Sequence, residues 1–497
     1  MIFNTTNRNN STLSLLEKFS LLFFLSGALF FQGCGVGQNP VEKIQNELQN
    51  ETEYAIILND MREEGNFFPS YYHQYRVDVG EQQTMRPFIE VDESYYKKNG
   101  PYLGMALAAG TATAYTVGNP QGKYQDPGIS DTEIVIGLHA PLSGRAKAYG
   151  VDALDAAKMW YKMINDRGGI WGRKIRVVTA DDKCSPNDLV AVVKKLVTVD
   201  KVFVVHGGSC THATIAAQEY ITREKVPMVM LNAAGDAGVF PPTRYMFGSF
   251  GGTQRTVGGS LIDFVTSKLG AKKIAYLAHD DDFGASNYLA AKWAADKNGV
   301  KIVEDQRVSR KIVDVTAPML KVRASGADVL VITTYTGPAA LAVKKAHEFG
   351  IKIPIVAAVQ AVPNLNAFVK NVGTKDAFKS FYYGSPLNDL TDGPKQKWII
   401  DMFKKNYPGR SPSPFMSYGV PSAMAIAQAL HNAGPNPTRE SFVDAMAALK
   451  FNTGILAGPI EFGENKRDGH NASIFLKYDG TNTSRVPGIF YNRMPAQ

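Results

Sequence analysis

Apolar and polar positions follow a repeating pattern from residue 132 onward, where short apolar runs alternate with amphipathic segments. Residues 133–138 (EIVIGL) are apolar enough for a buried strand, and further strands are predicted at residues 174–179, 201–205 and 226–231. Between the first two strands, apolar residues recur three and four positions apart, as on one helix face, at Leu154, Ala157, Tyr161 and Ile164. Strands and helices that alternate in this way form a parallel sheet with helices on both faces.

The alternation starts afresh near residue 273, with strands predicted at residues 274–278, 301–304 and 328–333, and later helices at residues 395–406, 417–432 and 438–449. Between the two series, residues 245–259 contain five glycines and no clear helical periodicity, as expected of a segment that passes between lobes. The expected fold class is therefore α/β, with two doubly wound parallel-sheet lobes joined by a hinge. Such lobes bind ligands in the cleft outside the carboxyl ends of their strands.

The first 33 residues have the features of an export signal. Arg8 and Lys18 precede an apolar run at residues 21–31, which is well short of the ~20 residues that a membrane-spanning helix needs. The pair Gly33-Cys34 that follows resembles the lipobox of bacterial lipoproteins, which implies that Cys34 is the acylated first residue of the mature chain. A simple secreted protein is the alternative, because the two residues before Gly33 depart from the usual pattern. In either case we expect export to the periplasm or the cell surface.

Residues 41–130 do not continue the α/β pattern. Strands are predicted at residues 54–58, 75–79 and 87–91, in a small α+β or β accessory region, and residues 118–128 have the composition of a linker. The sequence leaves open whether this region is a docking domain or a spacer from the membrane. No other apolar run reaches the ~18 residues of a transmembrane helix.

The number and placement of charged residues bear on whether the protein binds nucleic acid. The 497 residues contain 54 Lys and Arg against 46 Asp and Glu, a net charge of +8. Basic residues are scattered along predicted helices, as in the pairs 194–195, 344–345 and 404–405, without the clustered patch that nucleic-acid binding requires. We therefore expect no nucleic-acid partner.

Candidate catalytic and metal-binding motifs are weak. His206, Cys210 and His212 lie within seven residues, but no second ligand pair with zinc-type spacing accompanies them. The acidic turn at residues 280–282 follows a strand, and we interpret it as solvated carboxylates rather than a cation site. The sequence also lacks the Gly-x-Ser-x-Gly nucleophile motif and the Gly-Lys-Ser/Thr phosphate loop. We expect neither an enzyme nor a metal or other cofactor.

Five segments in a fixed order carry a family resemblance: IVIGLHAPLSG at 134–144, NDRGGI at 165–170, DDKCSP at 181–186, the strand end at 206–211 and GPIEF at 458–462. In this order they resemble the branched-chain amino acid binding proteins, the type I periplasmic substrate-binding proteins of ABC importers. The resemblance implies the type I periplasmic binding protein fold, in which a small-molecule ligand bridges two lobes and the closed form is recognised by a membrane permease.

The expected organisation follows from that resemblance. It comprises a signal peptide at 1–33, an anchor-proximal linker and accessory region at 34–130, a first lobe from 131–253 and 385–457, and a second lobe from 254–384 and 458–497. We expect a monomeric receptor whose partners are the ligand, an ABC importer permease and, through the lipid, a membrane. A sensory or regulatory module on the same fold, which hands a signal to a membrane partner, is the alternative.

The resemblance also implies a disulfide between Cys184 and Cys210, because leucine-binding members pair cysteines at both matching positions. Both cysteines follow predicted strands of one sheet, and an exported chain lies in an oxidising compartment. Closing this loop should stabilise the fold by about 3 kcal/mol on the chain-entropy estimate. Two free buried thiols are the alternative.

Ligand contacts are implied only where the motifs align. Thr211 matches a position whose hydroxyl and backbone N–H hold a ligand carboxylate, and Tyr149 matches an aromatic residue of the cleft. The next strand-end loop of the first lobe consists of Asn232, Ala233 and Ala234. In the second lobe, the residues implied to close over the ligand are Phe283, Tyr335 and Gln360.

Departures from the family pattern shape the ligand prediction. Gln360 stands where amino-acid binders present a carboxylate to the ligand's ammonium group, and burying an ammonium group without a counter-charge is costly. Asn232 and Ala234 replace small and hydroxyl residues, and Phe283 replaces a tyrosine. We expect a small carboxylate or amide, with an aromatic group favoured by the aromatic residues of the site, ahead of leucine itself. Alternatively, Phe283 and Tyr335 are simply core aromatics.

Overall fold

The computed structural model describes residues 124–494, except residues 145, 167, 234, 249, 389–393, 411, 412 and 414, together with three short strands before residue 117. The chain divides into two compact units, one formed by Met1–Gly65 with His73–Thr116 and the other by Asn66–Tyr72 with Val117–Gln497.

In the first unit, three short antiparallel strands form a sheet in the order β1 (Arg76–Val79), β2 (Gln82–Met85) and β3 (Tyr115–Thr116). Strand β1 coincides with the strand predicted at residues 75–79. The strands predicted at residues 54–58 and 87–91, the export signal and Cys34 lie outside the described residues.

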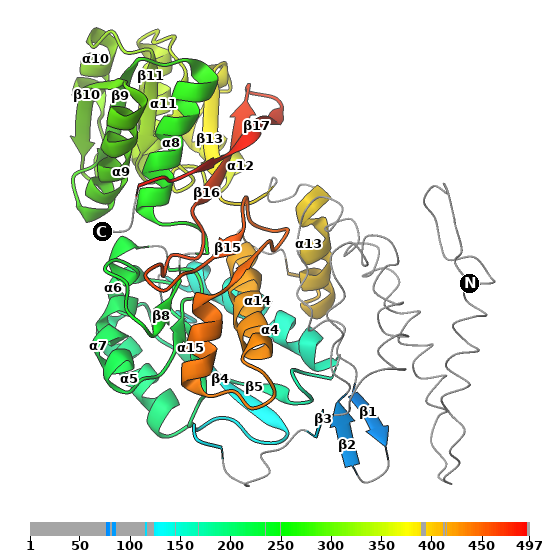
Figure 1. Cartoon of the computed structure of the whole chain (residues 1–497). Coiled ribbons are helices and arrows are strands. Elements are labelled where there is room, and N and C mark those ends of the chain that lie inside the picture. The colour runs from blue at the N-terminus through cyan, green and yellow to red at the C-terminus, as the bar shows by residue number, and fades with distance from the viewer. Residues whose placement is uncertain are drawn as a thin grey trace, which may run out of the picture. The chain divides into compact units, whose positions relative to one another are not determined.

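The second unit contains two α/β lobes, and the first lobe is built on a five-stranded parallel sheet (Figure 1). The strand order is β5-β4-β6-β7-β8, with β4 at Glu133–Ala140, β5 at Lys174–Asp181, β6 at Val204–Gly207, β7 at Met228–Val229 and β8 at Met246–Phe247. Seven of the eight residues of β4 are buried, as is typical of a parallel strand that is covered on both faces.

Helices cover both faces of this sheet. On one face, α4 (Lys147–Asp166) packs against α14 (Met416–Asn432), and both helices contact the buried His206 of β6. The helix α5 (Pro186–Thr198) lies on the other face. Gly137 of β4 points to that face, and a Cβ atom there would contact a side chain of α5. The remaining helices of this part of the chain are α6 (Thr211–Thr214), α7 (Gln218–Arg223), α13 (Pro394–Asn406) and α15 (Arg439–Ala447).

The second lobe has a seven-stranded sheet in the order β10-β9-β11-β12-β13-β16-β17. Five strands run parallel: β9 (Lys273–His279), β10 (Lys301–Val308), β11 (Val329–Thr333), β12 (Ile355–Ala357) and β13 (Phe381–Ser385). The C-terminal strands β16 (Ala472–Tyr478) and β17 (Thr483–Tyr491) extend it as an antiparallel edge. Together the two sheets confirm the predicted α/β fold class.

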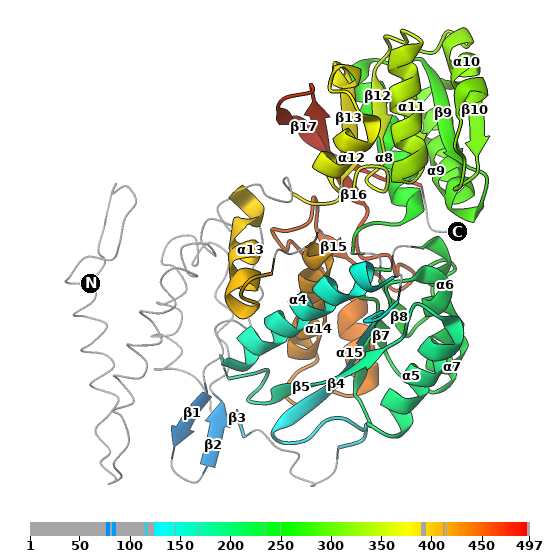
Figure 2. The same cartoon turned by 180° about the vertical axis from the view of Figure 1, so that it is seen from behind.

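Two apolar cores lie on opposite faces of the second sheet, under the helices that cover each face in Figures 1 and 2. The helices α8 (Gln254–Leu269) and α9 (Asp282–Asn298) cover one face, and α10 (Thr316–Ala324), α11 (Thr336–Glu348) and α12 (Leu365–Val372) cover the other. Successive residues of β9 alternate between the cores, since Tyr276 belongs to the first and Leu277 to the second.

The segment that leads from the first lobe into the second is shorter than predicted. Helix α8 begins at Gln254, with Thr253 and Thr256 in a reciprocal capping box, so residues 254–259 of the predicted 245–259 segment are helical. The prediction was wrong because two glycines interrupt the apolar pattern. A Cβ atom on Gly258 would lie 1.9 Å from the backbone oxygen of Asn287, so this glycine allows α9 to pack closely against α8.

A second connection runs beside the first. Gly248 pairs in parallel with Asp468, and the backbone N–H of Gly469 donates to the Gly248 oxygen at 2.7 Å. Just before this connection, the strands β14 (Lys450–Phe451) and β15 (Ile460–Glu461) form a small antiparallel pair. The chain therefore passes between the lobes along adjacent extended segments.

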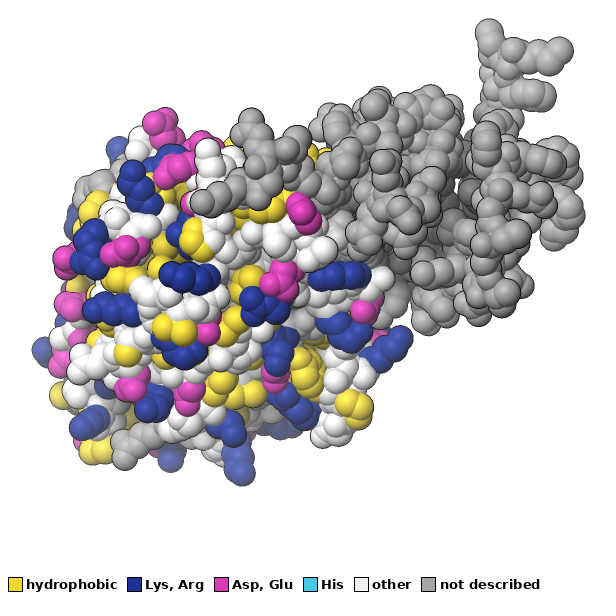
Figure 3. Space-filling model, turned by 90° about the horizontal axis from the view of Figure 1, so that it is seen from below, with side chains coloured by type: hydrophobic (Ala, Val, Ile, Leu, Met, Phe, Trp, Pro, Cys, Tyr) yellow, Lys and Arg dark blue, Asp and Glu magenta, His cyan; other side chains and the backbone are white. Residues whose placement is uncertain are grey.

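Charged side chains of both signs are scattered over the described part of the face shown in Figure 3, where Lys and Arg are interspersed with Asp and Glu. Exposed ion pairs one helical turn apart include Lys162 with Asp166 and Lys292 with Asp296. Within the described ranges, the structure contains no helix with both the length and the apolar character required to span a bilayer.

Candidate functional site

The carboxyl ends of β4, β6 and β7 meet at one edge of the first sheet, and the predicted ligand residues of that lobe follow these strands. Thr211 is the first residue of α6, and its Oγ accepts a hydrogen bond from the backbone N–H of Gly235 at 2.9 Å. Asn232 is partly exposed and Ala233 is buried, whereas Ala234 lies outside the described residues. The structure thus places Thr211 beside the loop that begins at Asn232.

Tyr149 lies in the first turn of α4 and reaches the same edge. The side-chain amide of Asn232 donates to the backbone oxygen of Tyr149 at 2.7 Å. The Tyr149 side chain is 49% exposed, and its ring meets Phe415 edge-on with the ring centroids 5.1 Å apart. Phe415 was not predicted as a site residue, because it stands alone in a Ser- and Pro-rich segment that carries no periodic signal.

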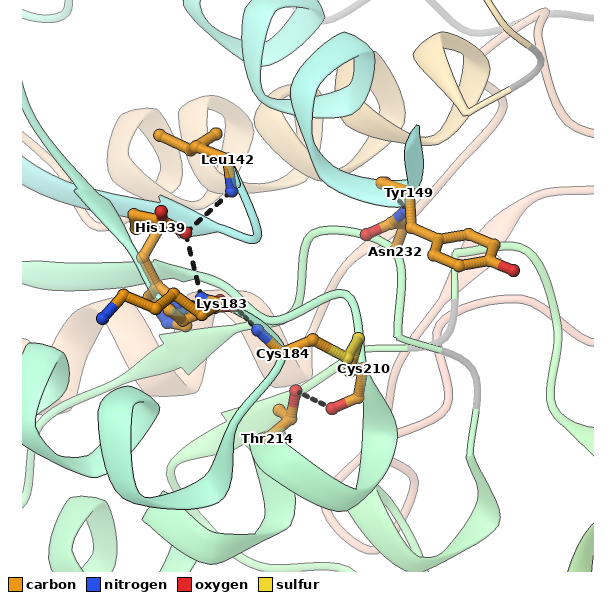
Figure 4. The surroundings of a disulfide bond; sticks show 10 residues. His139, Leu142, Tyr149, Lys183, Cys184, Cys210, Thr214 and Asn232 are labelled. Atoms are coloured by element: carbon orange, nitrogen blue, oxygen red, sulfur yellow. Dashed lines mark hydrogen bonds and ion pairs between the residues drawn. A yellow bond between two sulfur atoms is a disulfide. The ribbon is translucent and has the colours of Figure 1, made fainter. Parts of the chain in front are cut away.

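The structure contains the predicted disulfide between Cys184 and Cys210, whose Cα atoms lie 5.5 Å apart (Figure 4). Cys210 is the N-cap residue of α6, directly before Thr211. Cys184 lies in the turn between β5 and α5. The disulfide therefore ties this turn to the loop that carries Thr211, and the alternative of two free thiols is wrong.

In the second lobe, Phe283 and Tyr335 form a stacked pair whose ring centroids lie 4.7 Å apart. Phe283 is only 9% exposed, whereas Tyr335 is 37% exposed. The backbone N–H of Tyr335 donates to Nε2 of the buried His279 at 2.9 Å, and the Arg310 guanidinium lies 5.0 Å from the Tyr335 ring centroid. Phe283 is mainly a packing residue that supports Tyr335, and the Tyr335 side chain reaches solvent.

The surroundings of Tyr335 keep its phenol group protonated. Burial raises the pKa of Tyr335, the charge of Arg310 opposes this, and Asp281 and Tyr149 add to the rise. Tyr335 is therefore neutral over the physiological pH range.

Among the buried side-chain oxygens without a hydrogen-bond partner in the described part of the chain, three lie in loops that follow strands: Ser209 Oγ, Asn232 Oδ1 and Gln360 Oε1. Each atom is buried, and an unsatisfied buried acceptor costs free energy unless a ligand or water satisfies it. Gln360 and Asn232 were predicted as site residues. Ser209 was missed, because a serine before a cysteine carries no recognised motif. All three oxygens are uncharged.

The histidine and acidic motifs have structural roles. His206 is a core residue whose Nδ1 is hydrogen-bonded to the Tyr161 hydroxyl at 2.8 Å and whose Nε2 is hydrogen-bonded to Ser422 Oγ at 2.9 Å. Burial lowers the pKa of His206 to about 3. In the acidic turn, Asp281 caps α9 by accepting from the Gly284 N–H at 3.1 Å. The described residues include no group of three His, Cys, Asp or Glu side chains placed to hold a metal ion.

Two doubly wound lobes with polar and aromatic residues at their strand ends define a two-lobed ligand-binding protein. Residues 133–482 match the family described as Periplasmic binding protein, and the chain belongs to this family. The family is non-enzymatic, and the protein is accordingly a solute-binding protein of the periplasmic binding protein family.

The chain is also similar to individual proteins, in sequence or in fold. The chain is 28% identical over 308 residues to an amino acid binding protein of Pseudomonas aeruginosa, covering 61% of this chain and 80% of the relative. A branched-chain amino acid transporter substrate-binding protein from Streptococcus pneumoniae, solved with isoleucine, has a TM-score of 0.57 at 24% identity, covering 71% of this chain and 99% of that one. A solute-binding protein from R. palustris, solved with benzoate, has a TM-score of 0.57 at 18% identity, covering 72% and 97%.

Proposed function

We propose that this receptor captures a small aromatic carboxylate without an ammonium group and delivers it to the permease of an ABC importer. The observation that carries the proposal is the neutral amide of Gln360, whose Oε1 is buried and has no partner in the described residues. An amide oxygen can accept a hydrogen bond from an uncharged donor, but it supplies no charge to offset the desolvation of an ammonium group.

The other proposed contacts fit the same ligand. The Thr211 hydroxyl can still donate a hydrogen bond to a carboxylate, because its contact with Gly235 uses it only as an acceptor. Tyr149, Phe415 and Tyr335 offer aromatic surface to an aromatic group. The benzoate complex from R. palustris supports the proposal to the extent that this fold can hold such an acid.

A matched pair of ligands tests the proposal, since 3-phenylpropionate and L-phenylalanine differ only by the ammonium group. Calorimetric titration should show tighter binding of 3-phenylpropionate by the wild-type protein. The Gln360→Glu variant should reverse this order and bind L-phenylalanine at least about tenfold more tightly than the wild type does, because it restores a counter-charge. Tight binding of L-phenylalanine by the wild type, with none of the acid, would contradict the proposal.

We further propose that Cys34 carries a lipid that anchors a monomeric receptor to a membrane. The support is the apolar run followed by Gly33-Cys34, which resembles a lipobox. Mass spectrometry of the mature protein should find an acylated Cys34 at the N-terminus. A mature chain that begins elsewhere, or at an unmodified Cys34, would favour the simple secreted protein.

A further inference from the structure

The loops at the ligand-binding edge of the first lobe are joined to one another by side-chain contacts (Figure 4). One such loop follows each of the strands β4, β5, β6 and β7, and these loops belong to separate parts of the sequence. The β4–α4 loop leads to Tyr149, the β6–α6 loop contains Thr211, and the loop after β7 begins near Asn232. The β5–α5 turn carries no predicted ligand residue, yet it connects to two of the others.

Asp181, the last residue of β5, holds the β4–α4 loop. Its Oδ1 accepts hydrogen bonds from the backbone N–H groups of Leu142 at 2.8 Å and Lys183 at 2.9 Å, and its Oδ2 accepts from Ser143 Oγ at 2.6 Å. Burial would raise the pKa of Asp181, but these hydrogen bonds outweigh it and hold the pKa below its usual range. Asp181 is therefore a charged acceptor that fixes both its own turn and the neighbouring loop.

Asp182 and the disulfide extend these contacts to the β6–α6 loop. Asp182 Oδ1 accepts from the Cys184 N–H at 2.9 Å, and Oδ2 is hydrogen-bonded to Nδ1 of the buried His139 at 2.8 Å. Lys183 and Cys184 both adopt left-handed backbone conformations, with φ of 51° and 60°. Such residues persist only where surrounding contacts hold them, and here these contacts are the two aspartates and the bond to Cys210.

Two further hydrogen bonds close a ring of contacts among the four loops that follow β4, β5, β6 and β7. Thr211, next to Cys210, accepts from the Gly235 N–H, and Asn232 of the same loop donates to the backbone oxygen of Tyr149. Tyr149 in turn follows the loop that Asp181 holds. In the ring, the Cys184–Cys210 bond is the direct link between the β5–α5 turn and the Thr211 loop.

We propose that Asp181 and the Cys184–Cys210 disulfide are positioning elements of the ligand site, so that the oxidation state of the disulfide sets ligand affinity. A dithiol reductant transfers two electrons and two protons, which breaks the S–S bond, gives two thiols and closes the reductant's own disulfide. The freed turn then loses the constraint on its two left-handed residues, and the Thr211 loop loses its link to Asp181. Both cysteines are partly exposed, so a small reductant can reach them.

The proposal rests on the proposed function only for its affinity readout, so the test begins with a measurement that needs no ligand. Hydrogen–deuterium exchange is followed in the oxidised protein, after dithiothreitol treatment, and in a Cys184→Ser/Cys210→Ser variant. We expect faster exchange in peptides that cover residues 141–149 and 208–212 and unchanged exchange in α8 and α9, which shows that the second lobe stays folded. Titration with 3-phenylpropionate should then give an affinity about tenfold weaker than that of the oxidised protein.

Two aspartate variants separate positioning from general stability. Asp181→Asn, with the disulfide intact, should also loosen residues 141–149 and weaken 3-phenylpropionate binding. Asp166→Asn is the matched control, because Asp166 pairs with the exposed Lys162 at the carboxyl end of α4, away from the strand-end loops, and should leave both readouts unchanged. Equal exchange and equal affinity in the oxidised and reduced forms would overturn the proposal. If even the oxidised protein fails to bind the acid, the proposed ligand is wrong, and the exchange data alone decide whether the ring exists.

Discussion

Asparagine in place of Asp468 is expected to stabilise the fold at neutral and alkaline pH. Asp468 lies in the connection between the lobes, and burial raises its pKa to about 6. Lys466 and Arg255 oppose this rise, and the nearby Asp236 adds to it. Relative to the ordinary value of 3.8, the cost of ionising Asp468 in the folded state corresponds to about 3 kcal/mol.

The sign of the pH dependence follows from that raised pKa. The protonated form favours folding, so this contribution is fully present below pH 4 and is lost as the pH rises through about 6. The amide of the Asp468→Asn variant cannot ionise, and the variant should lose no stability in this window. Urea unfolding of the wild type and of Asp468→Asn should be measured at intervals from pH 4 to pH 8. The two free energies of unfolding should agree near pH 4, and at pH 8 the variant should be more stable by about 3 kcal/mol.

Asp479 supplies a control of opposite sign. Backbone N–H groups of Asn482 and Thr481 lower the pKa of this exposed aspartate, so its charge stabilises the fold and Asp479→Asn should be destabilising at neutral pH. That loss should shrink as the pH falls below the ordinary range of a carboxyl group. A destabilised Asp468→Asn variant at pH 8 would mean that the ionised Asp468 gains more from Lys466 and Arg255 than burial costs it.

The parallel strands could be predicted from the sequence because their signal is local. The apolar runs of β4, β9 and β11 each fill a buried strand, and the helices α4 and α5 show a clear helical period. The antiparallel edge was not predicted, since β16 pairs with β13 about ninety residues away and β17 is exposed over most of its length. No local pattern specifies such a pairing.

Some residues of the site could likewise be predicted from the local sequence, whereas others contact the site from distant segments. Strand ends and the family resemblance pointed to Thr211, Asn232 and Tyr149, and the structure places these three at one edge of a sheet. Phe415 meets Tyr149 from a segment more than 260 residues later, and this contact cannot be read from either segment alone. The role of Asp181 is likewise visible only in its three hydrogen bonds, because an aspartate at a strand end is ordinarily a solvated residue.

Alanine in place of Gly235 is expected to abolish most ligand binding while leaving the chain folded. The Gly235 backbone, with φ −75° and ψ 136°, is open to any residue, so no backbone strain arises. A Cβ atom there would lie 1.9 Å from Cγ2 and 2.6 Å from Oγ1 of Thr211, and this side chain must therefore move away from its present place. If Thr211 binds the ligand carboxylate, losing one charge-assisted hydrogen bond weakens binding by up to about 100-fold.

Titration of the Gly235→Ala variant with 3-phenylpropionate measures this effect, and thermal unfolding reports the separate cost of overpacking, about 1–3 kcal/mol. Gly337→Ala is the matched control, because a Cβ atom at Gly337 in α11 would meet nothing within 4 Å. The control should bind the acid as the wild type does. If Gly235→Ala binds equally well, Thr211 does not contact the ligand, and the carboxylate must be held elsewhere along the strand ends, where the unpartnered Ser209 Oγ is the nearest hydroxyl in sequence.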